Sequence, residues 1–445
     1  MRRGSAKPLR LLAALALTLC LVLVLSECTG LGQSGPPASS APGESPSVQA
    51  PAQDTPAQPD STAPGVPAAQ DPAPAGTQPL AGEYRAMWIS YLEWQSVDFS
   101  SEAAFRQDAA AMLDLSASLG LNTVIAQVRP FADALYESAL FPWSHLCTGT
   151  QGAAPGYDPL AILVELAHAR GLRLEAWLNP YRVRLNGSTP PELAADSPAV
   201  LHPDWVKASG DGLYFDPSSP EVQRYIVQGV EEILQNYAVD GIHFDDYFYP
   251  TTDPAFDEAE YAAAGSGLAL ADWRRENVNA LVRAVYDAVK ALRPAAAFGI
   301  SPQGNPDNNY NGQYSDVGLW MRESGYVDYV LPQLYWGYGY TTGGGSTRYA
   351  FENISAEWAG MQRAPSVALY FGLGAYRIGD GDGGNYDAAV SGWQTGHTLA
   401  DMIADGRRVG ADGYALYRYD FLGRNAAWPE LAAAENEAIA AANAG

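Results

Sequence analysis

Positively charged residues are scarce in this sequence. Its 445 residues include 26 Lys and Arg against 50 Asp and Glu, which gives a formal net charge of −24. Proteins bind nucleic acids and anionic lipid surfaces through clusters of Lys and Arg, and here these residues are few and scattered. The composition therefore argues against nucleic acid as a partner. It fits a protein outside the cytoplasm that acts on a neutral or polar substrate.

Cysteine and histidine are also rare. The three cysteines, Cys20, Cys28 and Cys147, give no disulfide framework once Cys20 is lost with a signal segment and Cys28 carries lipid. None of the 5 His residues is spaced from another as zinc ligands are, and no HExxH or HxxEH motif occurs. The glycine run Gly343–Gly345 lacks the strand–helix setting of a phosphate-binding loop. We therefore expect neither a metal ion nor another cofactor.

The N-terminus has the features of an export signal. Basic residues precede an apolar run, Leu11–Leu25, that is short for a membrane span but suits the core of a signal peptide. The segment Leu25-Ser26-Glu27-Cys28 is similar to a lipoprotein cleavage site, except that Glu27 replaces the usual small residue. Lipid attachment at Cys28, ordinary cleavage and an uncleaved anchor all remain open. In each case the protein is extracytoplasmic, either as a membrane-anchored lipoprotein or as a secreted protein.

The composition divides the chain into three parts. Residues 1–28 form the signal or anchor. Residues 29–82 form a linker rich in Pro, Ala, Ser, Gly and Gln that has no aromatic residue, Lys or Arg. Such a segment buries too little apolar surface to offset the entropy of ordering, so we expect it to be disordered. Residues 83–445 then form one catalytic domain.

Apolar runs typical of strands alternate with helical patterns in eight pairs from Tyr84 onward. The runs are mostly continuous, as expected for parallel strands covered on both faces. The expected strands are Arg85–Ser90, Thr123–Arg129, Arg173–Asn179, Gly241–Tyr247, Ala297–Gln303, Tyr329–Trp336, Ser366–Gly374 and Gly413–Asp420. Helical spacing of apolar residues occurs in Glu102–Leu119, Leu160–Arg170, Pro220–Tyr237 and Ala271–Leu292. The alternation predicts an α/β fold, a (β/α)₈ TIM barrel.

The connections indicate which end of the barrel is functional. Segments that lead into a strand are short, such as Gly120–Asn122, whereas segments that leave a strand are long, such as Pro130–Asp158 and Pro180–Ser218. Barrel enzymes build their sites on the loops that leave the carboxyl ends of the strands. The extra length of this chain lies in those loops, so we expect the site there.

Two adjacent carboxylates stand at the end of the expected fourth strand, Gly241–Tyr247. Buried carboxylates are costly unless they are hydrogen-bonded, paired with cations or used in chemistry. Strand alternation places His243 and Asp245 on one face and Asp246 on the other. We therefore expect Asp245 to carry the chemistry and Asp246 to support it.

Glu175 is a third candidate for catalysis. In the expected third strand it alternates onto one face with Trp177 and Asn179, but it lies deeper in the strand than Asn179. It is either a catalytic acid or base, or a buried partner for an Arg.

Polar and aromatic residues at the other strand ends suit a sugar substrate. Aromatic faces offer a large contact area, and Asn, Gln and Arg side chains read hydroxyl and amide groups. The candidates for substrate binding are Trp88, Arg129, Trp177, Asn179, Tyr181, Arg182, His243, Tyr247, Ser301, Gln333, Tyr335, Trp336 and Tyr417. Gln127 and Gln303 are further polar residues at strand ends.

Five motifs resemble, in this order, the glycosyl-hydrolase-like family 10, which was long a domain of unknown function. They are Arg85–Trp88 (RAMW), Gln127–Pro130 (QVRP), Ala176–Arg182 (AWLNPYR), Asp240–Pro250 (DGIHFDDYFYP) and Gly299–Pro302 (GISP). The resemblance covers nearly all of Tyr84 to about Tyr419, and Asp240–Pro250 is its most specific motif. It implies a TIM-barrel lipoprotein or secreted protein that hydrolyses a glycosidic bond in a bacterial envelope polysaccharide, such as peptidoglycan glycan strands. The family has His where this sequence has Glu175, which counts against an essential role for that side chain.

The resemblance to barrel glycosidases in general implies a role for Asp245. In that clan an Asp at the end of the fourth strand serves as the nucleophile or stabilises the oxocarbenium-like transition state. Hydrolysis also needs a second carboxyl group or assistance from an N-acetyl group of the substrate. The candidates for the second carboxyl group are Asp246, Glu175, Asp420 and carboxylates of the loops.

The sequence therefore predicts an extracytoplasmic glycoside hydrolase whose partner is an N-acetylated polysaccharide. Contact with a membrane is expected only through the N-terminal lipid or anchor. One alternative is a non-catalytic barrel that binds cell-wall glycans. Another is a metal-dependent carbohydrate deacetylase that uses Asp245, Asp246 and a His. The sugar linkage and the oligomeric state do not follow from the sequence.

Overall fold

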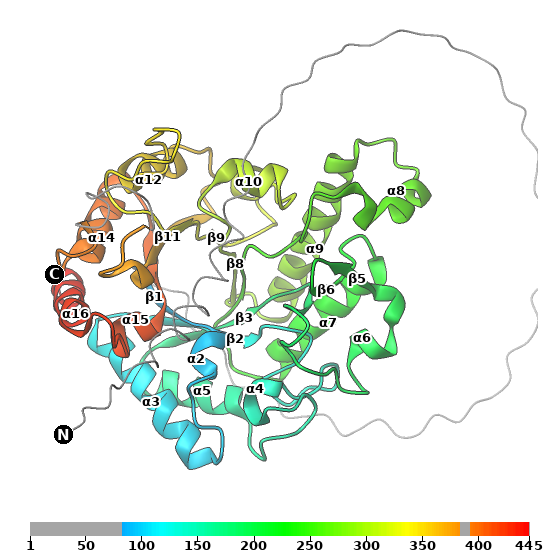
Figure 1. Ribbon diagram of the computed structural model, residues 1–445, viewed down its shortest axis with the longest axis horizontal. Helices are drawn as coiled ribbons and strands as arrows, with labels where there is room; N and C mark the ends of the chain where they lie inside the picture. Colours follow the sequence, from blue (N-terminus) through cyan, green and yellow to red (C-terminus); the bar gives the residue numbers. More distant parts are fainter. Residues whose placement is uncertain (1–81, 383–391, 445) are drawn as a thin grey trace, which may run out of the picture. The chain divides into compact units, whose positions relative to one another are not determined.

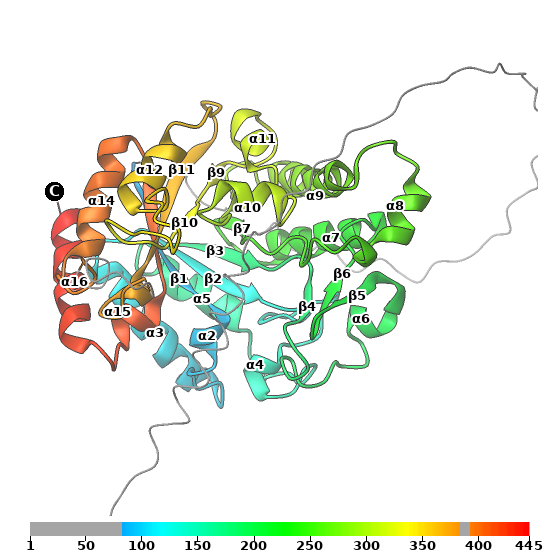
Figure 2. The ribbon, with the colours of Figure 1, turned by 45° about the horizontal axis from the view of Figure 1, so that its top comes forward.

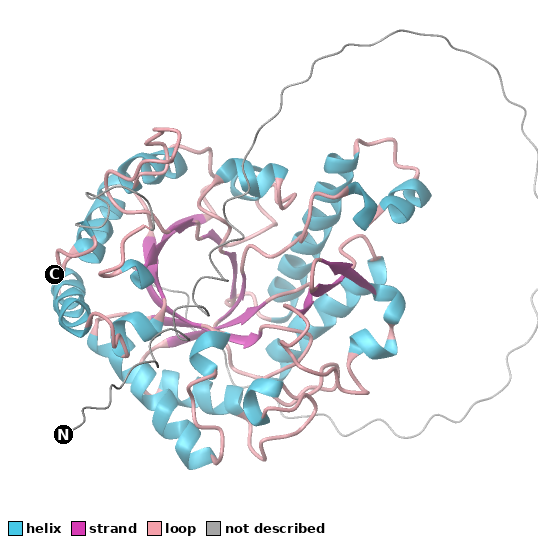
Figure 3. Ribbon diagram, in the orientation of Figure 1, coloured by secondary structure: helices cyan, strands magenta, loops and turns pink. Residues whose placement is uncertain are grey.

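The computed structural model describes residues 82–382 and 392–444, so the expected signal segment and linker, with Cys28, lie outside the described residues. In this part of the chain one closed parallel sheet has the order β10-β11-β12-β1-β2-β3-β7-β8-β9, and β9 also pairs with β11. β9 (Tyr329–Val330) and β10 (Gln333–Leu334) share one position, so the barrel has eight positions. Figure 3 shows the ring of strands with helices outside it. The predicted (β/α)₈ barrel is confirmed.

The strands that build the barrel are short and buried. Besides β9 and β10 they are β1 (Tyr84–Ile89), β2 (Thr123–Arg129), β3 (Arg173–Leu178), β7 (Gly241–Phe244), β8 (Ala297–Ile300), β11 (Ala368–Gly374) and β12 (Gly413–Tyr417). The expected strands begin within two residues of these positions, but several end earlier than expected. β7, β8 and β12 each end three residues earlier than expected, so that β7 ends before Asp245. The sixth strand is divided at Leu331-Pro332, because proline cannot donate to the ladder.

Helices cover the outside of the barrel (Figure 1). The long ones are α3 (Glu102–Ser118), α5 (Pro159–His168), α7 (Pro220–Asn236), α9 (Leu270–Leu292), α12 (Phe351–Ala359), α14 (Thr398–Val409) and α16 (Pro429–Asn443). Shorter helices lie in the connections, namely α2 (Tyr91–Trp94), α4 (His145–Thr148), α6 (Pro198–Leu201), α8 (Glu258–Ala264), α10 (Pro306–Asn311), α11 (Val317–Arg322) and α15 (Tyr419–Gly423). Over the described residues, no helix has both the length and the apolar character needed to cross a membrane.

A second, antiparallel sheet stands beside the barrel in the connection from β3 to α7. It has the order β4-β6-β5 and consists of β4 (Arg182–Arg184), β5 (Val206–Ser209) and β6 (Gly212–Phe215). Figures 1 and 2 both show it next to α6, outside the ring of strands. From its sequence this segment was expected to be a long loop, so this sheet was not predicted.

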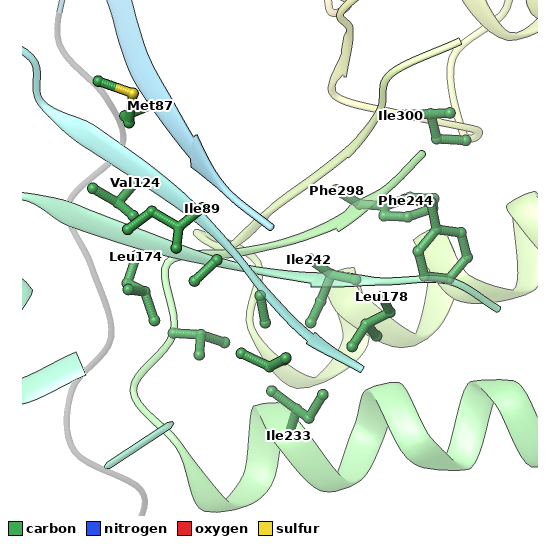
Figure 4. Close-up of a cluster of buried hydrophobic side chains, with 14 of the residues drawn as sticks. Met87, Ile89, Val124, Leu174, Leu178, Ile233, Ile242, Phe244, Phe298 and Ile300 are labelled. Atoms are coloured by element: carbon green, nitrogen blue, oxygen red, sulfur yellow. The ribbon is translucent and has the colours of Figure 1, made fainter. Parts of the chain in front are cut away.

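Two apolar clusters stabilise the fold, one on each face of the sheet. Outward-facing residues of the strands pack against the helices; Figure 4 shows Leu174, Ile242 and Phe244 with Ile233 of α7. The inward-facing residues form a smaller cluster inside the barrel, which includes Tyr84, Trp88, Ile125, Trp177, Tyr329 and Tyr370. The barrel is therefore filled by side chains, and its ligand site has to lie at one of its ends.

The first and last strands close the barrel. β1 pairs with β12 in parallel, with Tyr84 opposite Gly413. A Cβ atom on Gly413 would lie 2.1 Å from the carbonyl oxygen of Tyr84, so only glycine allows this approach. At the other end of the two strands, Glu93 of α2 accepts a hydrogen bond from Arg418, which follows β12. This ion pair joins the segments that follow β1 and β12 and so stabilises the closed barrel near the carboxyl ends of the strands.

Candidate active site

Asp245 and Asp246 lie at the carboxyl ends of the strands, directly after β7. Their exposed fractions are only 3% and 8%. Because β7 ends at Phe244, strand alternation does not extend to the two residues. The prediction that Asp246 points to the outer face of the strand was wrong: both side chains contact residues of the barrel mouth, on different sides of it.

Asp245 turns toward β3. The Nδ2 atom of Asn179, the residue after β3, donates a hydrogen bond to Asp245 Oδ2 at 2.8 Å. The backbone N–H of Tyr247 donates to Asp245 Oδ1 at 3.2 Å. Each oxygen of this carboxylate is thus held by an N–H donor of the protein.

Asp246 turns toward the opposite side of the mouth. Gln333 of β10 donates from Nε2 to Asp246 Oδ1 at 3.2 Å and also to the backbone oxygen of Ser301 at 2.9 Å. Gln313, in the connection between α10 and α11, donates to Asp246 Oδ2 at 3.4 Å. These two contacts are longer than the contact between Asn179 and Asp245, but Gln303 adds a third side-chain hydrogen bond to Asp246.

Burial and mutual repulsion change the acidity of the two carboxyl groups. Burial, followed by repulsion from Asp246, raises the pKa of Asp245 to about 7. Burial also raises the pKa of Asp246, against the hydrogen bonds of Gln303, Gln333 and Gln313. Two interacting carboxyl groups titrate as a pair, and the upper step of this pair falls near neutral pH. Near pH 7 the pair therefore has one proton available and one negative charge.

The positive charge of Arg182 acts on Asp245. Its guanidinium lies 5.0 Å from the ring centroids of Phe131 and Tyr247 and 5.5 Å from that of Tyr91, and its Nε donates to the Pro130 oxygen at 2.9 Å. Its positive charge lowers the pKa of Asp245 against the effect of burial. Arg182 and the N–H donors of Asn179 and Tyr247 favour the ionised form of Asp245, whereas the Gln donors favour the ionised form of Asp246, so the remaining proton belongs to the pair.

His243 lies below the aspartates, inside the barrel, and its two ring nitrogens have different roles. Nε2 lies 3.4 Å from Trp88 Nε1 and 2.9 Å from the Ser301 hydroxyl, and because the indole N–H can only donate, Nε2 accepts. Nδ1 then carries the proton and donates to the Tyr329 hydroxyl at 2.8 Å. Burial lowers the pKa of His243 to about 3, so the ring is neutral.

Glu175 does not join the aspartates. It pairs in register with Gly241 at the start of β7, and its Oε2 accepts hydrogen bonds from Tyr329 at 2.5 Å and Tyr84 at 3.0 Å. Arg173 lies 3.7 Å from its Oε1. The structure thus places Glu175 deep in the barrel as a partner of an Arg and two tyrosines, the second of the two expectations for this residue.

Several of the expected binding residues lie away from the mouth. A register shift in β2 between Gln127 and Arg129 pairs Arg129 with Leu178, an outward-facing residue, and its guanidinium lies over Phe141. Tyr181 is fully buried against Phe248 in the outer cluster. The structure therefore does not bring Arg129 or Tyr181 together with the aspartates.

The remaining candidates form the floor and walls of the mouth. Trp88 and Trp177 are buried in the inner cluster with their rings at an edge-on angle to His243. Tyr247 is 47% exposed, and Tyr335 stacks on Tyr417 at 5.3 Å between centroids. Trp336 stacks on Tyr349 at 5.0 Å. The exposed ring of Tyr247, two residues from Asp245, is the aromatic surface best placed to contact a sugar ring.

Two members of the site were absent from the sequence-based candidates. Gln313 lies in a connection, and Tyr91 in the short helix α2, where strand periodicity gives no signal. Gln127, noted only as a polar residue at a strand end, donates to Asn179 at 2.6 Å and so belongs to the site. Over the described residues, no group of three or more His, Cys, Asp or Glu side chains is arranged to hold a metal ion.

A (β/α)₈ barrel with a pair of carboxyl groups at the carboxyl ends of its strands is an architecture typical of glycoside hydrolase-like proteins. The chain belongs to the glycosyl hydrolase-like 10 family, whose model matches residues 83–388. The family resemblance inferred from the sequence motifs is confirmed.

Curated relatives agree with this assignment. The glycosyl hydrolase YngK of Bacillus subtilis is 39% identical over 319 residues, which cover 66% of this chain and 61% of the relative. The glycosyl hydrolase DigH of Escherichia coli is 37% identical over 350 residues, which cover 71% of this chain and 78% of the relative. The chain thus spans less than two thirds of the Bacillus relative's length.

Solved structures share the fold at low sequence identity. The glycoside hydrolase domain of PgaB (BpsB) from Bordetella bronchiseptica has a TM-score of 0.51 and 14% identity, with 80% of this chain and 99% of that chain covered. The α-L-fucosidase isoenzyme 2 of Paenibacillus thiaminolyticus has a TM-score of 0.50 and 13% identity, with 80% and 49% covered. These two similarities show the barrel fold alone.

Proposed function

We propose that this protein is a glycoside hydrolase that cleaves N-acetylated glycan strands of the bacterial envelope, with peptidoglycan strands as the substrate. The observation that carries the proposal is the buried pair Asp245 and Asp246, whose oxygens are held by amide N–H donors at the barrel mouth. Because the pair retains one proton near neutral pH, it offers an acid and an anion together.

The two carboxyl groups then have separate roles. Asp246 donates its proton to the glycosidic oxygen as the bond from that oxygen to the anomeric carbon breaks. Asp245, anionic beside Asn179 and Arg182, stabilises the positive charge that develops on the sugar. Water then adds to the anomeric carbon and returns a proton to Asp246.

The attacking group in the first step is proposed to come from the substrate. Among the described carboxylates at the other strand ends, Glu93 and Asp420 share Arg418, and Glu175 is deep in the barrel. A 2-acetamido group places its own carbonyl oxygen next to the anomeric carbon, which removes the need for a third carboxylate. We therefore expect a preference for N-acetylated glycans and a product of retained configuration.

The location of the protein in the envelope is part of the same proposal. It is supported by the N-terminal basic and apolar segment, by Cys28 and by the acidic composition of the chain. We infer that a lipid on Cys28 attaches the protein to the membrane and that residues 29–82 let the barrel reach the cell wall. The length of that spacer suits an insoluble substrate.

Separate Asp245→Asn and Asp246→Asn variants test the function. Each variant is assayed on purified peptidoglycan glycan strands and on an aryl 2-acetamido glycoside whose phenol leaves without a proton. We expect each variant to lose at least about 100-fold in rate on the strands. On the activated glycoside Asp246→Asn recovers most of its rate, because its missing proton is no longer needed, whereas Asp245→Asn does not.

Asp420→Asn is the control, since it removes a carboxylate from a strand end without touching the pair. We expect its rate to stay within about three-fold of the unchanged protein, as is usual for substitutions outside the reacting groups. Full activity of both pair variants on glycan strands would refute the proposal. Tight binding of the strands without any product would instead favour a non-catalytic wall-binding barrel.

A further inference from the structure

A chain of hydrogen bonds connects helix α2 to Asp245 beneath the mouth. The backbone N–H of Tyr91 donates to Gln127 Oε1 at 2.8 Å, and Gln127 Nε2 donates to Asn179 Oδ1 at 2.6 Å. Asn179 Nδ2 then donates to Asp245 Oδ2 at 2.8 Å. Gln127 and Asn179 are 0% and 1% exposed, so water does not compete for these groups.

The backbone N–H of Tyr91 fixes the direction of every hydrogen bond in this series. A backbone N–H can only donate, so the Gln127 atom that faces it is the oxygen, and the other end of the amide is the NH₂ group. That NH₂ group requires the oxygen of Asn179 to face it, which leaves the Asn179 NH₂ group for Asp245. A reversed Asn179 would place oxygen against a carboxylate and NH₂ against NH₂, two repulsive contacts.

We propose that Gln127 is a positioning residue, which holds the N–H of Asn179 on Asp245 and thereby favours the ionised form of Asp245 without touching the substrate. Its effect on Asp245 stands on geometry alone, and its consequence for turnover rests on the proposed function. A hydrogen bond to an ionised group contributes more than one between neutral groups, so fixing the donor has a measurable effect on acidity.

The first donor of the chain is held in place by the closure of the barrel. Tyr91 opens α2, whose capping box joins the Ser90 hydroxyl and backbone N–H to Glu93. Glu93 in turn pairs with Arg418 after β12. The backbone N–H of Tyr91 therefore has a fixed position relative to β2, and Gln127 transmits this position to the site.

The substitution Gln127→Glu reverses the direction of the hydrogen bonds between Tyr91 and Asp245, because Glu and Gln have nearly the same shape but Glu has no N–H group. The new carboxylate still accepts from Tyr91 but has no N–H for Asn179, so Asn179 turns its oxygen toward Asp245. We expect the apparent pKa of Asp245 to rise by about one unit. The measurement is a ¹³C NMR titration of the full chain with labelled Asp carboxyl carbons, with Asp245→Asn identifying the signal.

A second Gln of the same geometry supplies the matched control. Gln151 accepts from the backbone N–H of Ala194 at 2.8 Å and donates to Asp133 at 3.1 Å, outside this chain of hydrogen bonds. Gln151→Glu makes the same chemical change and should leave the pKa of Asp245 unaltered. An equal shift in this variant would show a general electrostatic effect and overturn the inference.

A double-mutant cycle separates two effects on the pKa of Asp245: that of the new negative charge at position 127 and that of the reversed Asn179 amide. In an Asn179→Leu background no amide can turn, so we expect the shift caused by Gln127→Glu to fall to less than half. An undiminished shift in that background would overturn the inference. If Gln127→Glu does not fold, Gln127→Met replaces it, with an expected rise of about half a unit; no rise would be equally decisive against the inference.

Activity gives a second, independent readout. In Gln127→Glu the acidic limb of the pH profile of kcat/KM should move to higher pH by the same amount as the NMR titration, since Asp245 has to be ionised. If the unchanged protein hydrolyses no glycan while the NMR shift is present, the proposed function fails and the positioning role stands. If hydrolysis is observed and neither the pH profile nor the NMR titration shifts, the positioning role fails.

Discussion

Asp245 and Asp246 are adjacent in sequence and both are shielded from water, so their charges interact strongly. The single proton that the pair retains can serve in catalysis only within a limited range of pH. Below the lower titration step both groups are neutral, and the anion is lost. Above the upper step both are ionised, and the acid is lost.

The activity on glycan strands should therefore fall as the pH rises through about 7. The sign follows from the upper titration step of the pair, which burial and mutual repulsion raise to near neutral pH and above which no proton is left for the acid. In Asp246→Asn the repulsion that contributes to this rise is absent, so Asp245 ionises at lower pH and the alkaline limb disappears. A pH profile of kcat/KM on the activated glycoside checks this, and an unchanged alkaline limb in Asp246→Asn would contradict it.

At the scale of single residues, the sequence predicted the residues at the barrel mouth better than the positions of residues deeper in the strands. Asp245, Asp246, Asn179 and Gln333 were identified because they follow apolar runs. The position of Arg129 could not be predicted, because one irregularity in β2 reverses the face on which it lies. Two roles were expected for Glu175, and only its tyrosine partners, on strands far away in sequence, decide between them.

At the scale of elements, the interior of the barrel depends on close contact between β8 and β9. Gly299 of β8 has no side chain, and the ring of Tyr329 occupies that space. A Cβ atom there would lie 2.0 Å from Tyr329 Cζ. Tyr329 cannot easily move, because it packs against Tyr84 and Tyr370 and its hydroxyl contacts His243 and Glu175.

Gly299→Ala should therefore lower the free energy of unfolding by about 1–3 kcal/mol, the usual cost of overpacking a core. The matched control is Gly344→Ala, where the nearest atom to the new methyl group is 3.9 Å away, and it should have little effect. Urea denaturation of both variants measures the difference. Equal stability of the two would show that the tyrosine cluster adapts without cost.

The repeating elements of the fold could be predicted from the sequence, and the irregular ones could not. Long helices such as α7 and α9 were placed within one or two residues, because their apolar spacing is regular over many turns. The small sheet of β4, β5 and β6 was missed because its strands have only three or four residues each. The end of β7 was missed because a strand pattern does not reveal where pairing stops.

At the scale of the whole molecule, the proposed location at the cell surface depends on attachment of the chain through Cys28. Replacing Cys28 by Ser tests the attachment directly. We expect the protein to move from the membrane fraction to the soluble extracytoplasmic fraction, because the lipid has no other acceptor in the cleavage site. Cell fractionation followed by immunoblotting makes the measurement, with Cys147→Ser as the control; retention of Cys28→Ser in the membrane would indicate an uncleaved anchor.

The contact between Glu93 and Arg418 joins residues that are 325 positions apart in the chain. A ribosome adds about 5–20 residues per second, so β1 waits for tens of seconds after its synthesis before its neighbour β12 exists. Throughout this time the ring of strands is open, and the edge of β1 is unprotected. For a chain that has to cross a membrane to reach the location proposed above, this delay is an advantage, because the barrel cannot close before its last strand has been made.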